Sequence, residues 1–206
     1  MPNFELTEQG GYGQVRQCQL ETLRNLCEIV QIPNPKFLEI GSWTGISTSV
    51  LAKYAKEKDG VVYAVDWFKG TPHTSLTNLA EATPILPIFT QNMAELGLSG
   101  NIKVKVMLSE EAVAEFPDNS LDFIFIDGDH RYAEVKKDLI MWYPKLKPGG
   151  VFCGHDCECR PSDIHWEIDE HLEEDWYNDV HPGVVKAVHE HFPECNIETD
   201  IWWVIK

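Results

Sequence analysis

Carboxylates in this 206-residue chain stand where short apolar runs end. Glu39 stands near the end of the first run, just before Gly41, and Asp66 ends the second run. Asp127 and Asp156 end two later runs. Apolar runs that alternate with helical patterns predict a parallel sheet with crossover helices. Ligands bind such sheets at the carboxyl ends of the strands. These residues are therefore the first candidates for chemistry.

The first of these turns, FLEIGSWTG at residues 37–45, discriminates between nucleotide ligands. A dinucleotide site needs G-x-G-x-x-G, because bare backbone must approach the pyrophosphate. Trp43 occupies the second glycine position and would block that approach. The remaining pattern, Glu39-x-Gly41-x-x-x-Gly45, suits a ligand with ribose and adenine but no phosphate, and S-adenosylmethionine is the commonest such ligand. A plain strand–helix turn, with glycines for packing, is the alternative.

Composition excludes several classes of partner. The net charge of −16 argues against nucleic acid, because phosphate backbones bind clustered Lys and Arg. No run approaches the ~20 apolar residues of a membrane span, and the N-terminus lacks a signal-peptide pattern. Six cysteines in a chain of this size do not indicate a disulfide scaffold. We expect a cytoplasmic protein with reduced thiols and no membrane partner.

The pattern predicts an α/β, Rossmann-like three-layer sandwich. Its sheet would be mostly parallel and seven-stranded, with an antiparallel C-terminal strand. The expected strands are residues 37–40, 61–66, 102–108, 121–127, 151–156, 196–199 and 201–205.

Helical periodicity marks residues 15–30 and 132–143. Lys147-Pro148-Gly149-Gly150 is expected to stop the second of these helices. Three prolines predict broken helices between residues 70 and 100.

The chain divides into a helical N-terminal extension, 1–35, and a catalytic domain, 36–206. The extension could pack on a partner copy in a homo-oligomer. From Asp156 to Asp179 there are ten carboxylates and one basic residue. We treat 156–182 as an acidic, lid-like insertion, with a solvated surface excursion as the alternative.

Four motifs carry a family resemblance: FLEIGSWTGIST, VVYAVDWFKGTPHT, LDFIFIDGDHRYAEVKKDL and LKPGGVFCGHD. In this order and spacing they resemble a class I S-adenosylmethionine-dependent methyltransferase. The motif style is similar to methyltransferase domain family 24 and to the catechol and macrocin O-methyltransferase-like group. The resemblance implies transfer of the methyl group of S-adenosylmethionine, with a small-molecule hydroxyl as the expected acceptor.

The resemblance also assigns cofactor contacts within the turn. Glu39 and Gly41 match positions that hold the methionyl amine and admit the cofactor. Trp43 and Gly45 belong to the same turn. Ser47 matches the hydroxyl that binds the methionyl carboxylate near a helix N-terminus.

Three further positions match contacts to the nucleoside. Asp66 would accept both ribose hydroxyls, or else cap a turn. Trp67 would cover the adenine, or else pack in the core. Ser109 would border the adenine, or else be a helix N-cap.

Asp127 and His130 fall where relatives carry out the reaction. Asp127 matches a metal-binding aspartate beside the reactive methyl and is counted among the cofactor contacts. His130 is expected to take the acceptor's proton, because an imidazole has a pKa near neutrality. The alternative is that His130 caps the following helix while Asp129 carries a solvent-facing charge.

Asp127 and Asp156, from neighbouring strands, suggest a Mg²⁺ site with His155 as a further ligand. The familiar third ligand is an asparagine, and Cys157 stands there instead; a metal-free site is therefore an alternative. The alternate spacing of Cys153, His155, Cys157 and Cys159 permits a zinc site on one strand face, without the C-x₂-C pairs typical of one.

Two other functional classes stay open. One is a methyltransferase-like protein that binds the cofactor without turnover, as a scaffold would. The other is a metal-dependent hydrolase or oxygenase built on the acidic, histidine-rich end. The acidic segment would disfavour anionic acceptors.

Overall fold

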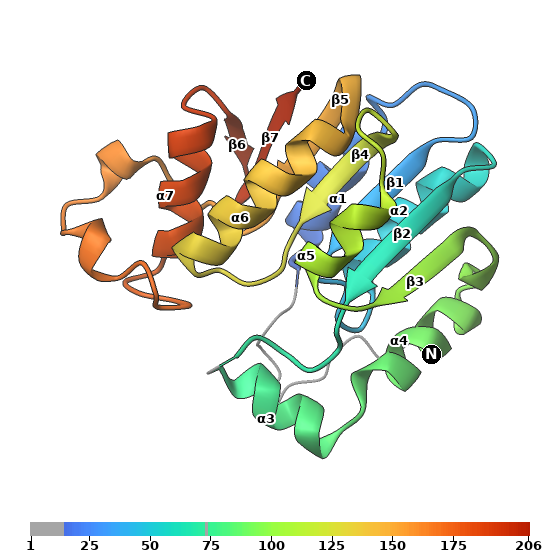
Figure 1. Cartoon of the computed structure of the whole chain (residues 1–206), viewed down its shortest axis with the longest axis horizontal. Helices are drawn as coiled ribbons and strands as arrows, with labels where there is room; N and C mark the ends of the chain where they lie inside the picture. Colours follow the sequence, from blue (N-terminus) through green and yellow to red (C-terminus); the bar gives the residue numbers. More distant parts are fainter. Residues whose placement is uncertain (1–14, 73) are drawn as a thin grey trace.

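The computed structural model describes residues 15–72 and 74–206, so the first part of the N-terminal extension lies outside the described residues. A single seven-stranded sheet runs through the molecule in the order β3-β2-β1-β4-β5-β7-β6 (Figure 1). Its strands are β1 Lys36–Ile40, β2 Val61–Asp66, β3 Ile102–Val106, β4 Leu121–Ile126, β5 Leu146–Gly154, β6 Asn196–Glu198 and β7 Ile201–Ile205. Strands β1 to β5 pair in parallel, and β7 is antiparallel to both of its neighbours. The predicted fold class is confirmed.

Helices cover both faces of the sheet, and each layer encloses its own core. One core lies under α1 Gln17–Cys27, α2 Ile46–Glu57 and α4 Ile85–Glu95. The other lies under α5 Ser109–Ala112, α6 Tyr132–Trp142 and α7 Pro182–His191. Helix α3 Ser75–Ala82 and α4 are the broken helices expected around the prolines. Along β1, Phe37 and Glu39 face the first core, and Leu38 and Ile40 face the second.

Several predicted boundaries are wrong. Strand β5 begins at Leu146, so the Lys-Pro-Gly-Gly run lies inside the strand, and a 3₁₀ turn at Tyr143–Lys145 ends the preceding helix. A shift in register on β4 between Leu121 and Phe123 accommodates the run. Strand β5 then stops at Gly154, so His155 and Asp156 lie in the loop beyond it. Helix α7 was not predicted.

The described part of the N-terminal extension packs on the chain's own sheet. Leu23, Leu26 and Cys27 of α1 are buried in the first core, and Arg16 pairs with Asp200 beside β7. In the described ranges, no helix combines the length and the apolar character needed to cross a membrane.

Gly41 is required by the junction between β1 and β4. Its φ is +84°, and a Cβ there would overlap the carbonyl oxygen of Asp127. Gly41→Ala is therefore expected to destabilise the fold by roughly 3–5 kcal/mol, through backbone strain and overpacking together. Gly97→Ala is the matched control, because Gly97 also has a positive φ but nothing lies near its missing Cβ.

The control should cost only about 1–2 kcal/mol of backbone strain. Urea unfolding of both variants measures the difference. Equal losses of unfolding free energy would show that the contact with Asp127 does not matter.

Candidate active site

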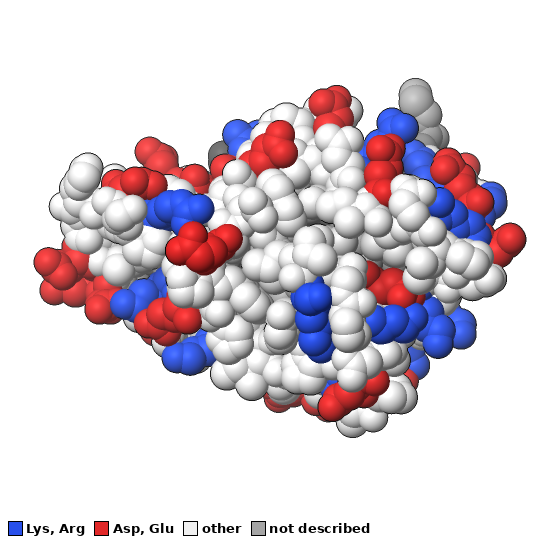
Figure 2. Space-filling model, turned by 90° about the horizontal axis from the view of Figure 1, so that it is seen from above, with Lys and Arg blue, Asp and Glu red and all other residues white. Residues whose placement is uncertain are grey.

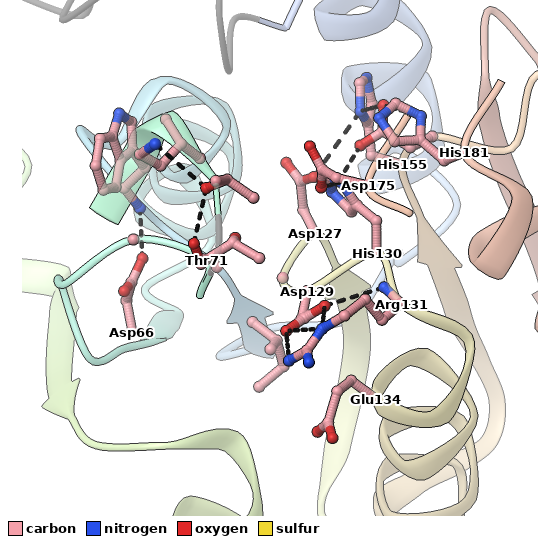
Figure 3. A pocket seen from close by; sticks show the side chains of 18 of the residues that line it. Asp66, Thr71, Asp127, Asp129, His130, Arg131, Glu134, His155, Asp175 and His181 are labelled. Atoms are coloured by element: carbon pink, nitrogen blue, oxygen red, sulfur yellow. Dashed lines mark hydrogen bonds and ion pairs between the residues drawn. The ribbon is translucent and has the colours of Figure 1, made fainter. Parts of the chain in front are cut away.

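A large cavity opens at the carboxyl ends of β1, β2, β4 and β5, where the polar residues of the sequence patterns converge (Figure 3). Its volume is about 1680 Å³. Sites for one ligand typically occupy ~300–1,000 Å³, so this cavity has room for two molecules. Asp66 lies on one side of it, and Asp127, His130, His155 and His181 gather on the other.

Asp66 holds the loop around it through backbone amides. The amide of Trp43 donates to Oδ2 at 2.7 Å, and that of Phe68 donates to Oδ1 at 2.6 Å. The bond from Phe68 is a turn cap of the kind that the sequence offered as an alternative role. Each oxygen keeps a second lone pair, so the carboxylate can still accept hydroxyl groups from the cavity that it lines.

Glu39 lies under the turn rather than in the cavity. Its side chain is fully buried, and it accepts hydrogen bonds from Ser42 at 2.7 Å and from Thr48. Burial raises the pKa of Glu39 to about 7, although the neighbouring hydroxyls oppose the shift. Its Oε1 has no hydrogen-bond partner among the described residues.

The other predicted residues divide between the cavity wall and the packing beneath it. Those that line the cavity are Gly41, Trp43, Ser47, Asp66, Trp67, Ser109, Asp127, His130, His155 and Asp156. Gly45 does not line the cavity, because it packs against Met93 and Phe89, whose side chains a Cβ at this position would meet. Its φ of +93° places it as the N-cap of α2, with Ser47 in the first turn.

Ser109 links the cavity wall to a buried carboxyl. Its hydroxyl accepts from the indole N–H of Trp142 at 2.7 Å and donates to Asp138. The N-cap of α5 is Leu108, so the prediction of Ser109 as an N-cap is wrong. Burial raises the pKa of Asp138 to about 7, and the bond from Ser109 only partly offsets it.

This shift makes a prediction about stability. The folded protein holds a proton on Asp138 up to about pH 7, whereas the unfolded chain releases it near 3.8. Stability therefore falls as pH rises between these values, by ~1.4 kcal/mol per pH unit. Asp138→Asn should remove this dependence on pH. The free energy of unfolding of the variant should therefore rise relative to that of the wild type between pH 5 and pH 7. Urea unfolding of both proteins at several pH values measures this difference. Parallel plots of unfolding free energy against pH for the variant and the wild type would contradict the prediction.

Three imidazoles converge on the carboxylate of Asp156. The Nε2 atom of His130 lies 3.1 Å from Oδ2, and the Nδ1 atom of His155 lies 2.8 Å from Oδ1. The Nδ1 atom of His181 is 3.5 Å from the same Oδ1. Asp156 has a φ of +62°, a turn conformation that aspartate tolerates, and this turn takes the chain away from the line of β5.

The charges in this cluster shift one another's pKa values. Burial opposes ionisation of Asp156, yet His155 and His130 hold its pKa well below the usual range. Burial would lower the pKa of His130, but Asp156 and Asp175 raise it well above the usual value. Burial would also lower the pKa of His155, but Asp156 and Asp127 raise it to about 9. Burial raises the pKa of Asp127.

Asp127 completes the cluster from the end of β4. Its Oδ1 lies 3.8 Å from Nδ1 of His155. Asp127, His155 and Asp156 each offer a ligand atom, and these atoms lie within 4.8 Å of one another. The Nε2 atom of His155 is buried and has no hydrogen-bond partner among the described residues. Buried polar atoms without partners are rare, and a bound ligand is one explanation.

Sequence reasoning missed the residues that support the cluster. The Oδ1 atom of Asp175 lies 2.8 Å from Nδ1 of His130, and Oε1 of Glu158 lies 2.6 Å from Nδ1 of His181. Their only signal was their place in a carboxylate-rich segment without periodicity.

The predicted alternative role of His130 is wrong, because Arg131 is the N-cap of α6. Asp129 pairs with Arg131 at 2.6 Å and is 19% exposed, so its charge does not simply face solvent.

The cysteines do not join the site. Strand β5 ends before Cys157, whose thiol packs 4.0 Å from His189 in the second core. Cys153 is buried in the other core. The predicted common strand face is therefore wrong. Within residues 15–72 and 74–206, neither group suited to a metal ion contains a cysteine.

The sequence of residues 38–157, more than half of the chain, matches the family model described as a methyltransferase domain. The chain belongs to this family. It is a class I methyltransferase of the type that uses S-adenosylmethionine, and its fold agrees with that assignment.

Solved structures share the fold of the methyltransferase at low identity, and curated proteins resemble its sequence. The O-methyltransferase TomG from Streptomyces achromogenes, in complex with SAM, superposes with a TM-score of 0.65. It is 15% identical, over 94% of this chain and 82% of that one. An uncharacterized protein of Acanthamoeba polyphaga mimivirus is 24% identical over 86% of this chain and 70% of its own length.

A third match, to an uncharacterized protein of Sinorhizobium fredii, is 44% identical over 50 residues. It covers 24% of this chain, and the methyltransferase spans only 6% of that protein's length.

The acidic segment forms one wall of the methyltransferase's cavity. Glu173, Asp175, Trp176 and Asp179 line it, and the carbonyl of Leu172 accepts from the amide that begins α6. Figure 2 shows acidic side chains gathered at the end of the molecule where Figure 1 places this segment and α7. The segment thus lies over the same edge of the sheet as the cluster.

Proposed function

We propose that this methyltransferase transfers a methyl group to a hydroxyl of a small molecule, assisted by a divalent metal ion. The observation that carries the proposal is the convergence of Asp127, Asp156 and three imidazoles on one wall of the cavity. A hydroxyl is a weak nucleophile until it loses its proton, and carboxylates with imidazoles are the groups that provide for that loss.

The opposite half of the cavity suits S-adenosylmethionine. Asp66 has lone pairs left for the ribose hydroxyls, and it lines the cavity together with Trp67. The first turn of α2, with Ser47, offers the helix N-terminus that favours a carboxylate. Glu39 would act from beneath the turn, by fixing the hydroxyls of Ser42 and Thr48. The cofactor supplies the electrophilic methyl group.

Asp127, Asp156 and His155 would hold the metal ion. The fit rests on their mutual distances, with Nδ1 of His155 facing both carboxylates. Two carboxylates with one imidazole can bind Mg²⁺, although an imidazole suits a transition metal better. A cation there would lower the pKa of the acceptor hydroxyl.

His130 is the residue proposed to take the proton. Asp175 fixes the ring through Nδ1, so Nε2 is the atom that exchanges a proton beside Asp156. Both nitrogens of His130 face carboxylates, which raise its pKa well above the usual value and favour the protonated ring. The role therefore requires that a cation or the acceptor first displaces the proton between His130 and Asp156.

The acceptor is proposed to be neutral or cationic. Carboxylates of the acidic segment line its side of the cavity, and an anion there would meet like charge.

The test is a methyl-transfer assay with a panel of catechols, simple phenols and glycosides. S-adenosylhomocysteine release and methylated products are followed by mass spectrometry, with Mg²⁺, with Mn²⁺ and with EDTA. The proposal predicts acceptor-dependent release that EDTA suppresses. Cofactor binding without release across the whole panel would instead favour a protein that binds without turnover. Release that EDTA does not affect would remove the metal from the proposal.

A further inference from the structure

We propose that His130, Asp156 and His181 form a second cation position, which takes a transition metal ion of the Zn²⁺ or Mn²⁺ type. It extends the metal site of the proposed function, because Asp156 belongs to both groups. It does not depend on methyl transfer. An ion on Nε2 of His130 would occupy the atom proposed above to take the proton, so the ion-bound state and the proton-accepting state exclude one another. No pattern in the sequence pointed to His181 as a ligand.

The ligand atoms of the three residues already stand at suitable separations. They lie within 4.8 Å of one another, with His130 Nε2 at 3.1 Å and His181 Nδ1 at 3.5 Å from the two oxygens of Asp156. Atoms bound to one ion at ~2.1 Å are themselves about 3 Å apart. The arrangement that now shares protons can therefore receive an ion with small side-chain movements.

A supporting carboxylate holds the ring of His130 from behind. Asp175 contacts Nδ1 of His130 at 2.8 Å, which leaves Nε2 free to face Asp156. A carboxylate on the far nitrogen of a ligating histidine is the common way in which proteins orient such ligands.

His181 is fixed through Glu158. The amide of His181 donates to Oε2 at 3.1 Å, while Oε1 lies 2.6 Å from Nδ1. Glu158 is thus near enough to serve as a further oxygen ligand. Figure 3 shows His130, His155, His181 and Asp175 on the same side of the cavity.

The donor set selects the type of ion. Two imidazoles and a carboxylate suit Zn²⁺ and related transition metals, whereas Mg²⁺ prefers oxygen ligands and keeps its water. The carboxylates of Asp156, Asp175 and Glu158 supply the negative charge that a buried dication needs. Because Asp156 is shared, occupation of both groups would make it a bridging ligand.

The test measures metal affinity rather than activity. The full chain, stripped with EDTA, is titrated with ZnCl₂ and with MgCl₂ by calorimetry, and Co²⁺ is added to follow its visible absorption. We expect Zn²⁺ to bind at least ~100-fold more tightly than Mg²⁺. His181→Gln should weaken Zn²⁺ binding by at least ~10–100-fold and change the Co²⁺ spectrum, with little effect on Mg²⁺.

Two variants control for indirect effects. His191→Gln replaces an exposed histidine at the far end of α7, the helix for which His181 is the N-cap, and should bind Zn²⁺ as the wild type does. Asp175→Asn removes only the support of His130 and should weaken Zn²⁺ by about tenfold, with its unfolding curve in EDTA checked in parallel.

Wild-type Zn²⁺ affinity in His181→Gln would overturn the second position. So would loss of Zn²⁺ binding in Asp127→Asn alone, which would place the ion in the first group. A wild-type chain that binds no Zn²⁺ overturns the inference as well, while methyl transfer with Mg²⁺ would still decide the proposed function separately.

Discussion

Asp156→Asn is expected to reduce methyl transfer by about 10²–10³-fold, the cost of removing one preorganised electrostatic group from an active site. The carboxylate lies within 3.5 Å of a ring nitrogen of each of His130, His155 and His181. Asparagine keeps the size of the side chain and tolerates the positive φ of this position, so the change isolates the charge. Without that charge, neither metal group keeps its shared ligand.

Initial rates of S-adenosylhomocysteine release measure the effect, with an acceptor found by the panel. Asp169→Asn is the matched control, since Asp169 lies in the same segment, is exposed and forms an ion pair with Lys186, away from the cluster. An Asp156→Asn enzyme with wild-type rates would remove the cluster from the mechanism.

Asp66→Ala is expected to raise the dissociation constant of S-adenosylhomocysteine by about 10²–10⁴-fold. Two hydrogen bonds to a charged carboxylate would be lost, each worth ~1.5–3 kcal/mol at most. Part of the loss would be indirect, because Asp66 also holds the amides of Trp43 and Phe68. Asp66→Asn separates the two effects, since its remaining carbonyl oxygen can keep one amide while the charge is gone.

Calorimetric titration with S-adenosylhomocysteine measures both variants. Asp118→Ala, which removes an exposed aspartate paired with Lys145, should bind like the wild type. An unchanged affinity in Asp66→Ala would mean that the cofactor does not use this end of β2.

The parallel strands and their acidic ends could be predicted because the chain marks them locally. Continuous apolar runs precede Asp66 and Asp127, and both faces of those strands are indeed buried by helices. The order of the four sequence motifs, which resembles that of methyltransferases, indicated the class of reaction. Helix α7 escaped notice because it begins with Pro182-Gly183 and continues with valines, a composition that does not favour a helix.

The sequence did not predict which of these side chains are buried and which reach the cavity. Glu39 stands at a position that suggests cofactor contact, yet strand alternation turns it under α2. His181 and Asp175 reach the site only because the acidic segment folds back over the sheet edge, through long-range contacts such as the Tyr132 amide with Leu172. Residues 156–181 show no helical or strand periodicity from which this folding back could be predicted.

A crystal structure with S-adenosylhomocysteine and Mn²⁺, with anomalous data to locate the ion, would show both halves of the site at once. We expect the ribose hydroxyls on Asp66, the cofactor sulfur directed toward Asp127, and an anomalous peak beside Asp156. A cofactor bound with its sulfur away from Asp127, or an ion bound elsewhere with Asp156 unliganded, would contradict this expectation.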